Sequence, residues 1–466
     1  MTDFADPGQT DNVVTLHPGA WTKEGFQVTG ESMTMAWLDE MTNNGGVNYC
    51  CVNGYWFVYA DGVWTLDETG IVARAVGAFC RRVGLVKKNK AKTRREIETF
   101  AMHRGILMRA RDELSVGIGS FDADDELLVT PGGMLALDGD DTPMMPHDRD
   151  RYASKCCAVA PSDMATPLWD QFIDRICGGK SDLVEYLYRF FGYCLTGLTT
   201  EQIFVFCYGL GQNGKTVLLE TIRGIMGSYA SKASIELLIE HRHERHPEEL
   251  ASMRGVRLLM AEETNSGRSW NEALLKQLVS GDTLRARFMR RDSFEFQPKF
   301  KIVVAGNHKP RISAVDKAMK RRIHIIPFNV QIQDHEKNPR LRADLREEWP
   351  GILAKLIDGQ RQWRLIGLAP PAAVIDATAE YVEDEDAVGQ WLDDCGIKAN
   401  TPRARASMDQ LYRSWVVWAG NNGEAKISKK ALSQALCSHG FERYRVENER
   451  GFIGLHITPS APGSLL

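Results

Sequence analysis

The sequence predicts an α/β fold: a P-loop core of parallel strands, a mainly helical N-terminal domain before it and a C-terminal winged helix after it. A glycine-rich loop, Gly209 to Thr216, lies between the apolar run 202–208 and a helical pattern. Apolar runs at 256–261, 300–305 and 323–327 have the character of strands buried on both faces. The C-terminal segment is then predicted to contain two helices followed by a pair of strands, which is the order of elements in a winged helix.

Composition limits the class of protein. A chain of 466 residues has room for about two to four domains. Its net charge of −4 excludes a uniformly basic surface, so any DNA contact must come from local patches. Ten cysteines include no C-x-x-C pair, which favours reduced thiols in a cytoplasmic protein. We expect no membrane segment, because Arg189 breaks the longest apolar stretch.

The N-terminal part divides into three stretches. We expect residues 1–30 to be disordered and residues 31–120 to form a small α+β domain, with Asn53-Gly54 and Asp61-Gly62 as hairpin turns between aromatic strands. The aromatic strip could stack on bases, although packing is the simpler role. The cationic run 87–95 is either a solvated surface or a phosphate contact. Residues 121–200 read as a helical domain.

The glycine-rich loop has the form G-x-x-x-x-G-K-T, which predicts an ATP site. Its glycines allow backbone N–H groups to surround phosphate oxygens at the positive end of the following helix. We expect Lys215, as a solvated side chain, to reach the β- and γ-phosphates, and the Thr216 hydroxyl to bind Mg²⁺. The predicted nucleotide-binding residues are Gly209, Gly211, Gln212, Asn213, Gly214, Lys215, Thr216 and Val217.

Polar residues follow two of the later strands. Glu262 and Glu263 end the second apolar run, and this position suits Mg²⁺ and water. We assign Glu262 to the metal's coordination sphere, through water, and Glu263 to polarising the attacking water. Asn307 follows the third run and could hydrogen-bond either a γ-phosphate or that water.

Two groups of basic residues have candidate roles. Arg321 and Arg322 precede the last strand of the core, 201–330, and either could act as an arginine finger on a neighbouring subunit's ATP. Residues 284–296 read as a hairpin turning near Arg291-Asp292, with a basic tip. For contact with DNA the hairpin offers Arg287, Phe288, Arg290 and Arg291.

The remaining segments read as a helical lid and linker, 331–371, and a winged helix, 372–466. Lysines and arginines make the winged helix locally basic: Lys426, Lys429, Lys430, Arg443, Arg445 and Arg450. Contact with DNA and docking to a protein both remain open for it.

Taken together, these motifs resemble the superfamily III helicases of the phage/plasmid primase family, kin to the poxvirus primase-helicases, over residues 120–457. The resemblance implies an AAA+-like ATPase core that uses ATP and Mg²⁺ and assembles as a ring, a hexamer. It also implies translocation along single-stranded DNA to open forked DNA in replication, for a phage or mobile element in a bacterial host.

The sequence departs from the family pattern in three places. Thr216 stands where many relatives have Ser, and Glu262-Glu263 stands where Asp-Glu is usual. The first 120 residues show no primase active site. We therefore expect a helicase half, with priming absent or supplied by a separate primase or polymerase.

Two other functions remain open. The chain could be an origin-binding replication initiator that uses ATP only to switch its assembly, or an ATPase that remodels proteins. Unwinding of forked DNA without an origin sequence separates the helicase from the initiator. DNA-independent ATPase activity without affinity for single strands would favour the remodelling ATPase.

Overall fold

The computed structural model describes residues 20–22, 26–43, 46–86, 91–139, 143–240, 247–262, 269–287, 293–312, 317–395, 397, 404–424, 426–446 and 449–457. The chain forms two compact units, one of residues 1–124 with 146–155 and the other of residues 125–145 with 156–466. Most of the N-terminus expected to be disordered lies outside the described residues.

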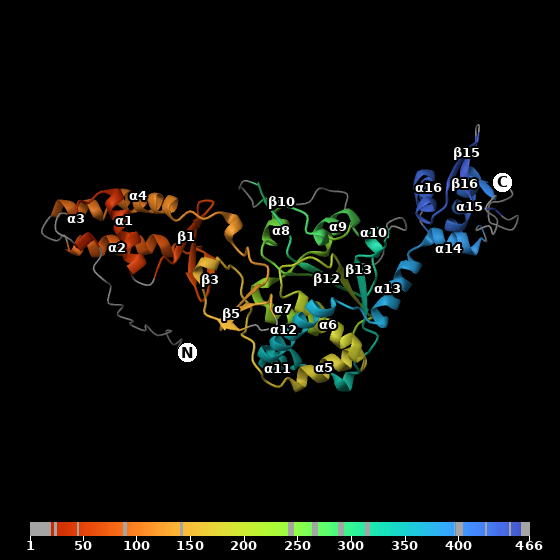
Figure 1. The fold of residues 1–466 in the computed structure, drawn as a ribbon, viewed down its shortest axis with the longest axis horizontal. Coiled ribbons are helices and arrows are strands. Elements are labelled where there is room, and N and C mark those ends of the chain that lie inside the picture. The colour runs from red at the N-terminus through yellow and green to blue at the C-terminus, as the bar shows by residue number, and fades with distance from the viewer. Residues whose placement is uncertain are drawn as a thin grey trace, which may run out of the picture. The chain divides into compact units, whose positions relative to one another are not determined.

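The first unit combines a helical bundle with a small antiparallel sheet (Figure 1, red to orange). The helices are α1 (Gly30–Asn43), α2 (Ile71–Val86), α3 (Ala91–Ile97) and α4 (Phe100–Glu113). The strands β1 (Tyr49–Val52), β2 (Tyr55–Ala60) and β3 (Val63–Leu66) pair in chain order. Asn53-Gly54 and Asp61-Gly62 all have positive φ and join strands paired directly at their ends, so both predicted hairpin turns are confirmed.

The aromatic strip of these strands is used in part for packing. Trp64 is 3% exposed, stacks on Tyr152 and donates its indole N–H to the Arg149 carbonyl at 2.8 Å. A buried indole of this kind cannot stack on a base, so Trp64 supports the packing interpretation.

The second unit is built on a five-stranded parallel sheet, in the order β13-β7-β12-β9-β8. Its strands are β7 (Phe204–Tyr208), β8 (Ala230–Lys232), β9 (Leu258–Glu262), β12 (Lys301–Gly306) and β13 (Ile323–Pro327). The sequence predicted four of them within two residues at each end. It missed β8, because a three-residue edge strand whose residues are half-buried or exposed has no apolar run.

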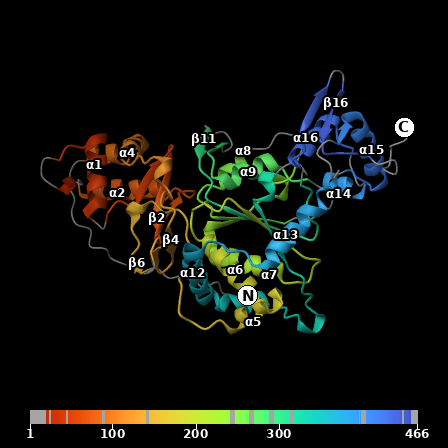
Figure 2. The same ribbon diagram turned by 45° about the vertical axis from the view of Figure 1, so that its right-hand side comes forward.

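Both faces of the sheet are buried, as the unbroken apolar strands predicted. Alternate residues of each strand enter two different cores: Val205 and Cys207 face one, and Phe204 and Phe206 face the other. On the first face lie α5 (Pro167–Cys177), α6 (Ser181–Tyr193), α7 (Lys215–Met226), α11 (Leu341–Glu347) and α12 (Trp349–Ile366). On the second face lie α8 (Pro247–Ser252), α9 (Glu272–Ser280) and the hairpin β10 (Leu284–Arg287) and β11 (Ser293–Phe296) (Figure 2).

Segments before and after the sheet share its first core. The strand pair β4 (Leu127–Thr130) and β5 (Gly133–Ala136), with β6 (Met144–Met145), brings Leu128 and Leu135 into the same core as α5 to α7. Arg257, 3% exposed, donates to the Leu127 carbonyl at 2.8 Å and lies over the Tyr229 ring. Parts of the stretches 121–200, 201–330 and 331–371 therefore share the core on the first face of the sheet. The stretch 121–200 is not a purely helical domain, because it contains β4 to β6 and its residues 121–124 and 146–155 belong to the first unit.

Helices α6 and α12 approach each other at two glycines. A Cβ built on Gly192 would lie 2.3 Å from the Gln360 nitrogen, and one on Gly359 would lie 2.1 Å from the Tyr188 carbonyl oxygen. Both obstacles are backbone atoms, which cannot rotate away. Only glycine permits this contact.

The C-terminal part has its own core around Trp391, Trp415 and Trp418. After α13 (Ala372–Asp384) and α14 (Ala387–Asp394) come β14 (Arg405–Ser407), α15 (Met408–Asn421), α16 (Lys429–Ser438), β15 (Arg443–Val446) and β16 (Glu449–Ile453). The strands pair in the order β14-β16-β15. The two predicted helices and the strand pair are present, and β14 is an addition. No helix among the described residues is both long and apolar enough to cross a membrane.

We expect Gly192→Ala to lower the free energy of unfolding by about 1–3 kcal/mol, because the new methyl group must displace the α12 backbone. Gly420→Ala is the matched control: Gly420 also lies in a helix, and a Cβ placed on it would have no atom within 4 Å. Chemical denaturation should show Gly420→Ala to be neutral or up to about 1 kcal/mol stabilising. Equal stabilities for the two variants would contradict the close contact of α6 with α12.

Candidate nucleotide-binding site

The register of the parallel sheet places the predicted site residues at one edge. Tyr208 at the end of β7 pairs with Gly306 of β12 and with Pro327 of β13, while Glu262 pairs with Ala305. The loop beginning at Gly209 therefore lies beside Asn307, and Glu262 lies one strand further along. The carboxyl edge of a parallel sheet is where ligands bind in open α/β folds.

Lys215 and Asn307 are in direct contact. The Lys215 ammonium donates to Asn307 Oδ1 at 3.2 Å and to the Gly209 carbonyl. Lys215 is only 6% exposed, and its burial lowers the pKa of the ammonium group. Our expectation of a solvated lysine is therefore wrong. An ammonium has three N–H donors, and these two bonds leave a third for a ligand at the edge of the sheet.

The buried side chain of Asn213 fixes the glycine-rich loop to the sheet by a hydrogen bond. It is 3% exposed, and its amide donates to the Phe328 carbonyl at 3.1 Å, just beyond β13. A Cβ on Gly209 would lie 2.1 Å from that amide nitrogen, so this hydrogen bond requires glycine at position 209. The side chain of Asn213 thus holds the loop to the sheet, and its backbone N–H is the group that remains to meet a phosphate.

Helix α5 supports the other end of the loop. Gly214 has φ of +81°, and a Cβ there would lie 2.5 Å from Ile176 Cγ2 and 3.2 Å from Phe172. Close packing against α5 and the left-handed backbone both demand glycine. The segment before the sheet therefore fixes the shape of the loop.

A pocket of ≈ 590 Å³ adjoins the loop. Gln212, Gly214 and Val217 form one wall, and apolar side chains of α5, Ile332 and Leu341 form much of the rest. Polar residues also line it: Gln171, Lys337 and Asn338. Arg175 and Glu336 lie at this pocket and form an ion pair at 2.9 Å. The hydrogen bond from Arg175 lowers the pKa of the Glu336 carboxyl group to about 2. Apolar walls with a few polar groups are typical of a small-molecule site.

The acidic end of β9 has a basic neighbour. Glu262 is exposed, and Lys232 of β8 lies 3.3 Å from its carboxylate and 2.6 Å from Glu220 of α7. The hydrogen bond to Glu220, opposed by slight burial, raises the pKa of Lys232, so its charge is retained. Lys232 thus orients the carboxylate that we assigned to the metal. Glu263 lies outside the described residues.

The residues assigned to Mg²⁺ fit that ion. Thr216 is exposed in the first turn of α7, and Glu262 is exposed at the same edge of the sheet. Among the described residues, no three His, Cys, Asp or Glu side chains gather to hold a metal. A hydroxyl, one carboxylate, water and phosphate oxygens are a common donor set for Mg²⁺.

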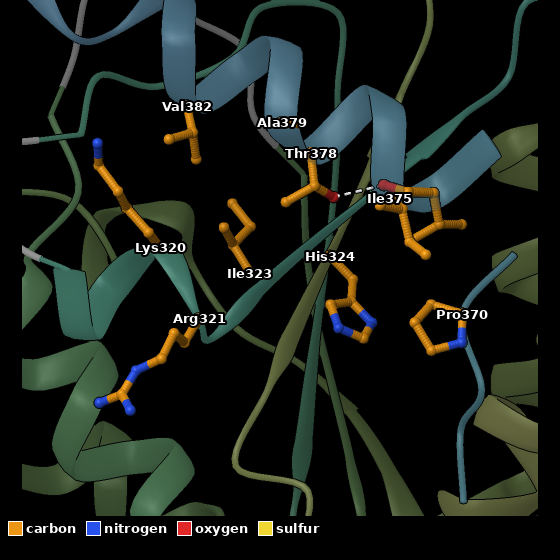
Figure 3. Close-up of a pocket in the computed structure, with 10 residues that line it drawn as sticks. Lys320, Arg321, Ile323, His324, Pro370, Ile375, Thr378, Ala379 and Val382 are labelled. Atoms are coloured by element: carbon orange, nitrogen blue, oxygen red, sulfur yellow. Dashed lines mark hydrogen bonds between the residues drawn. The ribbon is translucent and has the colours of Figure 1, made fainter. Parts of the chain in front are cut away.

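Arg321 and Arg322 do not join this cluster within one chain. They precede Ile323, which pairs with Phe204 at the start of β7, so they lie at the amino edge of the sheet. Arg321 lines a pocket of ≈ 320 Å³ between β13 and α13, where Ile323 and His324 face Pro370 and Thr378 (Figure 3). Burial lowers the pKa of His324 to about 4, so its ring is neutral, and it bonds Tyr186 at 2.7 Å.

The predicted basic hairpin is present. Leu284 pairs with Phe296 and Arg287 with Ser293, so residues 288–292 connect the two strands. The expected turn at Arg291-Asp292 falls in this segment, which lies outside the described residues. Leu284 and Ala286 are buried in the second core, whereas Arg287 is exposed. Phe288, Arg290 and Arg291 lie outside the described residues.

Sequence reasoning missed Lys232 and the α5 wall of the pocket. Lys232 could have been found by asking for a second strand directly after α7, since consecutive strands of such folds are joined by a helix. The wall could not have been found, because nothing in the spacing of residues 167–177 distinguishes a pocket wall from core.

Two family models match the chain. The model described as "D5 N terminal like" matches residues 34–178, so this similarity starts well before residue 120. A model described as a family of unknown function, DUF5906, matches residues 207–322, which include the loop, Glu262 and the hairpin.

Viral proteins are similar over part of the chain. A candidate helicase of Acanthamoeba polyphaga mimivirus is 27% identical over 292 residues, 59% of this chain and 30% of that protein. A candidate helicase of Frog virus 3 is 26% identical over 52% of this chain and 26% of its own length. A candidate primase of African swine fever virus is 32% identical over 32% of this chain and 16% of its own length. The chain thus spans less than a third of each relative.

One solved structure shares the fold. The apo structure of the NrS-1 C-terminal region superimposes with a TM-score of 0.52 at 10% sequence identity. The match covers 88% of this chain and 96% of that one.

We expect Lys215→Met to remove nucleotide binding without unfolding the protein. Methionine retains much of the buried volume and removes a desolvated charge, so the melting temperature without ligand should stay level or rise. Mg-ATP at a hundredfold excess over Kd should stabilise the wild type by about 2.7 kcal/mol and thereby raise its melting temperature. It should leave the melting temperature of Lys215→Met unchanged.

Lys355→Met serves as the control for that experiment, because Lys355 is paired with Asp170 away from the loop. It should keep the full response to nucleotide. A nucleotide-dependent shift in Lys215→Met would contradict the assignment of the site.

Proposed function

This chain belongs to the primase-helicase family, and from that premise we propose that it is an ATP-dependent DNA helicase that forms a ring and translocates on single-stranded DNA during replication. The observation that carries the proposal is the contact between Lys215, in the glycine-rich loop, and Asn307, at the end of the neighbouring strand. It joins a phosphate-binding cation to a polar amide at the edge where ligands bind.

The strand order supports a P-loop, AAA+-like core. Strand β7, which leads into the glycine-rich loop, lies between β12 and β13, and β12 separates it from β9. This arrangement sets the loop, Asn307 and the acidic end of β9 side by side. For the C-terminal part, the order α14-β14-α15-α16-β15-β16 with the sheet β14-β16-β15 supports a winged helix.

Each site residue then has a task in ATP hydrolysis. Backbone N–H groups of residues 211–216 and the third N–H of Lys215 hold the phosphates. Thr216 and, through water, Glu262 hold Mg²⁺, which would neutralise charge that develops on the β- and γ-phosphates. Glu263 polarises the attacking water, and Asn307, oriented by Lys215, bonds that water or the γ-phosphate. The pocket of Gln212, Val217 and α5 accepts the base.

An initiator that uses ATP only to switch its assembly is the second candidate. The basic residues of the C-terminal part favour it, since Arg443, Arg445 and Arg450 lie on the paired strands β15 and β16 and are exposed. Unwinding assays on a fork without any origin sequence decide between the two. Unwinding supports the helicase, and sequence-specific binding without unwinding supports the initiator.

We expect Arg322 to act in trans on a neighbouring subunit's ATP, with Arg321 as the second choice. The amino edge of the sheet is remote from the same chain's loop, so either arginine needs a second copy to meet a phosphate. Arg322→Ala and Lys215→Met should each lack ATPase activity. Mixed together they should recover part of it, because a mixed ring contains some interfaces with both residues intact.

Separately inactive variants that recover no activity at any mixing ratio would overturn the shared site. Native mass measured on the same mixtures shows whether mixed rings formed. Arg340→Ala is a suitable control, since Arg340 is an exposed arginine near Asp344. This variant should keep full ATPase activity, and mixing it with Lys215→Met should add no activity beyond its own.

We expect the exposed side chain of Arg287 to contact the phosphates of single-stranded DNA. Arg287→Ala should weaken binding to all sequences and reduce the salt dependence, by about 0.7 in the slope of log K against log salt. Arg285→Ala is the matched control, because Arg285 lies on the same exposed face but donates to Ser293 at 2.9 Å. Equal affinities and slopes for the two variants would argue against DNA at the hairpin.

A further inference from the structure

The first unit contains a concentration of positive charge that the proposed helicase mechanism does not use. Residues 71–111 include twelve lysines and arginines and only two glutamates, in a chain whose net charge is −4. A stretch of sequence usually mixes both signs of charge, so an excess of this size suggests contact with an anionic ligand.

Some of these arginines are already matched by carboxylates. Arg82 pairs with Glu40, Arg94 with Glu98 at 3.0 Å, and Arg109 with Glu31 at 3.8 Å. Their charges contribute to the structure of the bundle and are partly cancelled.

Four arginines remain on two packed helices. Arg74 and Arg81 are exposed on α2, and Arg104 and Arg111 are exposed on α4. The members of each pair are seven residues apart, so they lie on the same side of their helix, about 10.5 Å from each other along its axis. We call these four side chains the arginine face.

Helices α2 and α4 pack against each other, and Gly77 of α2 lies at their contact. A Cβ built on Gly77 of α2 would lie 3.5 Å from Arg81 Nη1 and 3.9 Å from His103 of α4. The Arg81 guanidinium and the His103 ring thus both lie near Gly77, and His103 directly precedes Arg104 in α4. The two pairs of arginines thus lie on neighbouring helices of one bundle.

Helix α4 also presents an aromatic ring to solvent. Phe100, one helical turn before Arg104 on α4, is 78% exposed. Such exposure leaves a large apolar group in water with nothing gained from burial. A base stacked on the ring removes that surface from water, while guanidinium groups bind the phosphates on either side of it.

We propose that the arginine face, together with Phe100, is a binding site for single-stranded DNA in the first unit, separate from the β10–β11 hairpin. Arginine forks suit phosphate oxygens, and an exposed ring among them suits unpaired bases rather than a duplex, whose bases are already stacked. The inference rests on the proposed function only for the choice of DNA as the ligand. The site itself needs neither ATP nor a ring.

The test compares two full-length double variants that each lose two positive charges. Arg81→Ala with Arg104→Ala removes half of the arginine face, and Arg94→Ala with Arg109→Ala removes two paired arginines of the same bundle. Binding to fluorescent oligo(dT) is measured without nucleotide over a range of salt concentrations. The face variant should bind at least about tenfold more weakly, with the slope of log K against log salt reduced by about 1.4. The control variant should match the wild type.

Phe100→Leu examines the stacking contact separately. It should weaken binding to oligo(dT) about fivefold or more while leaving the salt slope unchanged, because stacking releases no counterions. Met108→Leu, a similarly exposed change on α4, should have no effect. Circular dichroism of every variant shows that the bundle remains folded.

Two results would overturn the proposal. One is a face variant whose affinity and slope equal those of the control. The other is a face variant that keeps its affinity for oligo(dT) but loses binding to duplex DNA or to vesicles containing phosphatidylserine, since the ligand would then be a different one. ATPase activity without DNA, measured on the same variants, reports on the proposed function independently. An inactive wild type would refute the helicase and leave this test valid.

Discussion

The parallel register of β7, β12, β9 and β13 determines where every proposed nucleotide contact lies. Once Tyr208, Gly306 and Pro327 are level, the residues that follow these strands must emerge together. Lys215 and Asn307, 92 residues apart, lie within 3.2 Å of each other at this edge. A one-residue slip of β12 would turn Asn307 to the other face of the sheet, and the contact would be lost.

The glycine-rich loop does not hold its own shape. Ile176 and Phe172 of α5 close on Gly214 from one side, and the Phe328 carbonyl receives Asn213 from the other. These supports come from before and after the sheet, so the proposed ATP site depends on a core that spans residues 128–374. The close contact of α6 with α12 contributes to the same core.

Residues whose roles depend on local chemistry were predicted well from the sequence. The loop, the four long strands, the residues of both hairpin turns and the basic hairpin follow from apolar runs and glycine positions, which act within a few residues. Residues whose roles depend on distant partners were not. Nothing near Asn213 indicates that its amide bonds Phe328, and nothing near Lys232 indicates its contacts with Glu220 and Glu262.

The burial of Lys215 shows why such contacts matter for function. A lysine in water would lose little by leaving a phosphate, whereas Lys215 is desolvated and satisfied by two protein acceptors. Its third N–H has no access to bulk water comparable to that of a surface lysine, so a phosphate oxygen is a strong partner for it. Movement of Lys215 toward a phosphate also changes the bond to Asn307 at the end of β12. In the proposed function, the state of the nucleotide would thereby be transmitted to a central strand of the sheet, whose other face packs against the core that anchors the hairpin at Leu284 and Ala286.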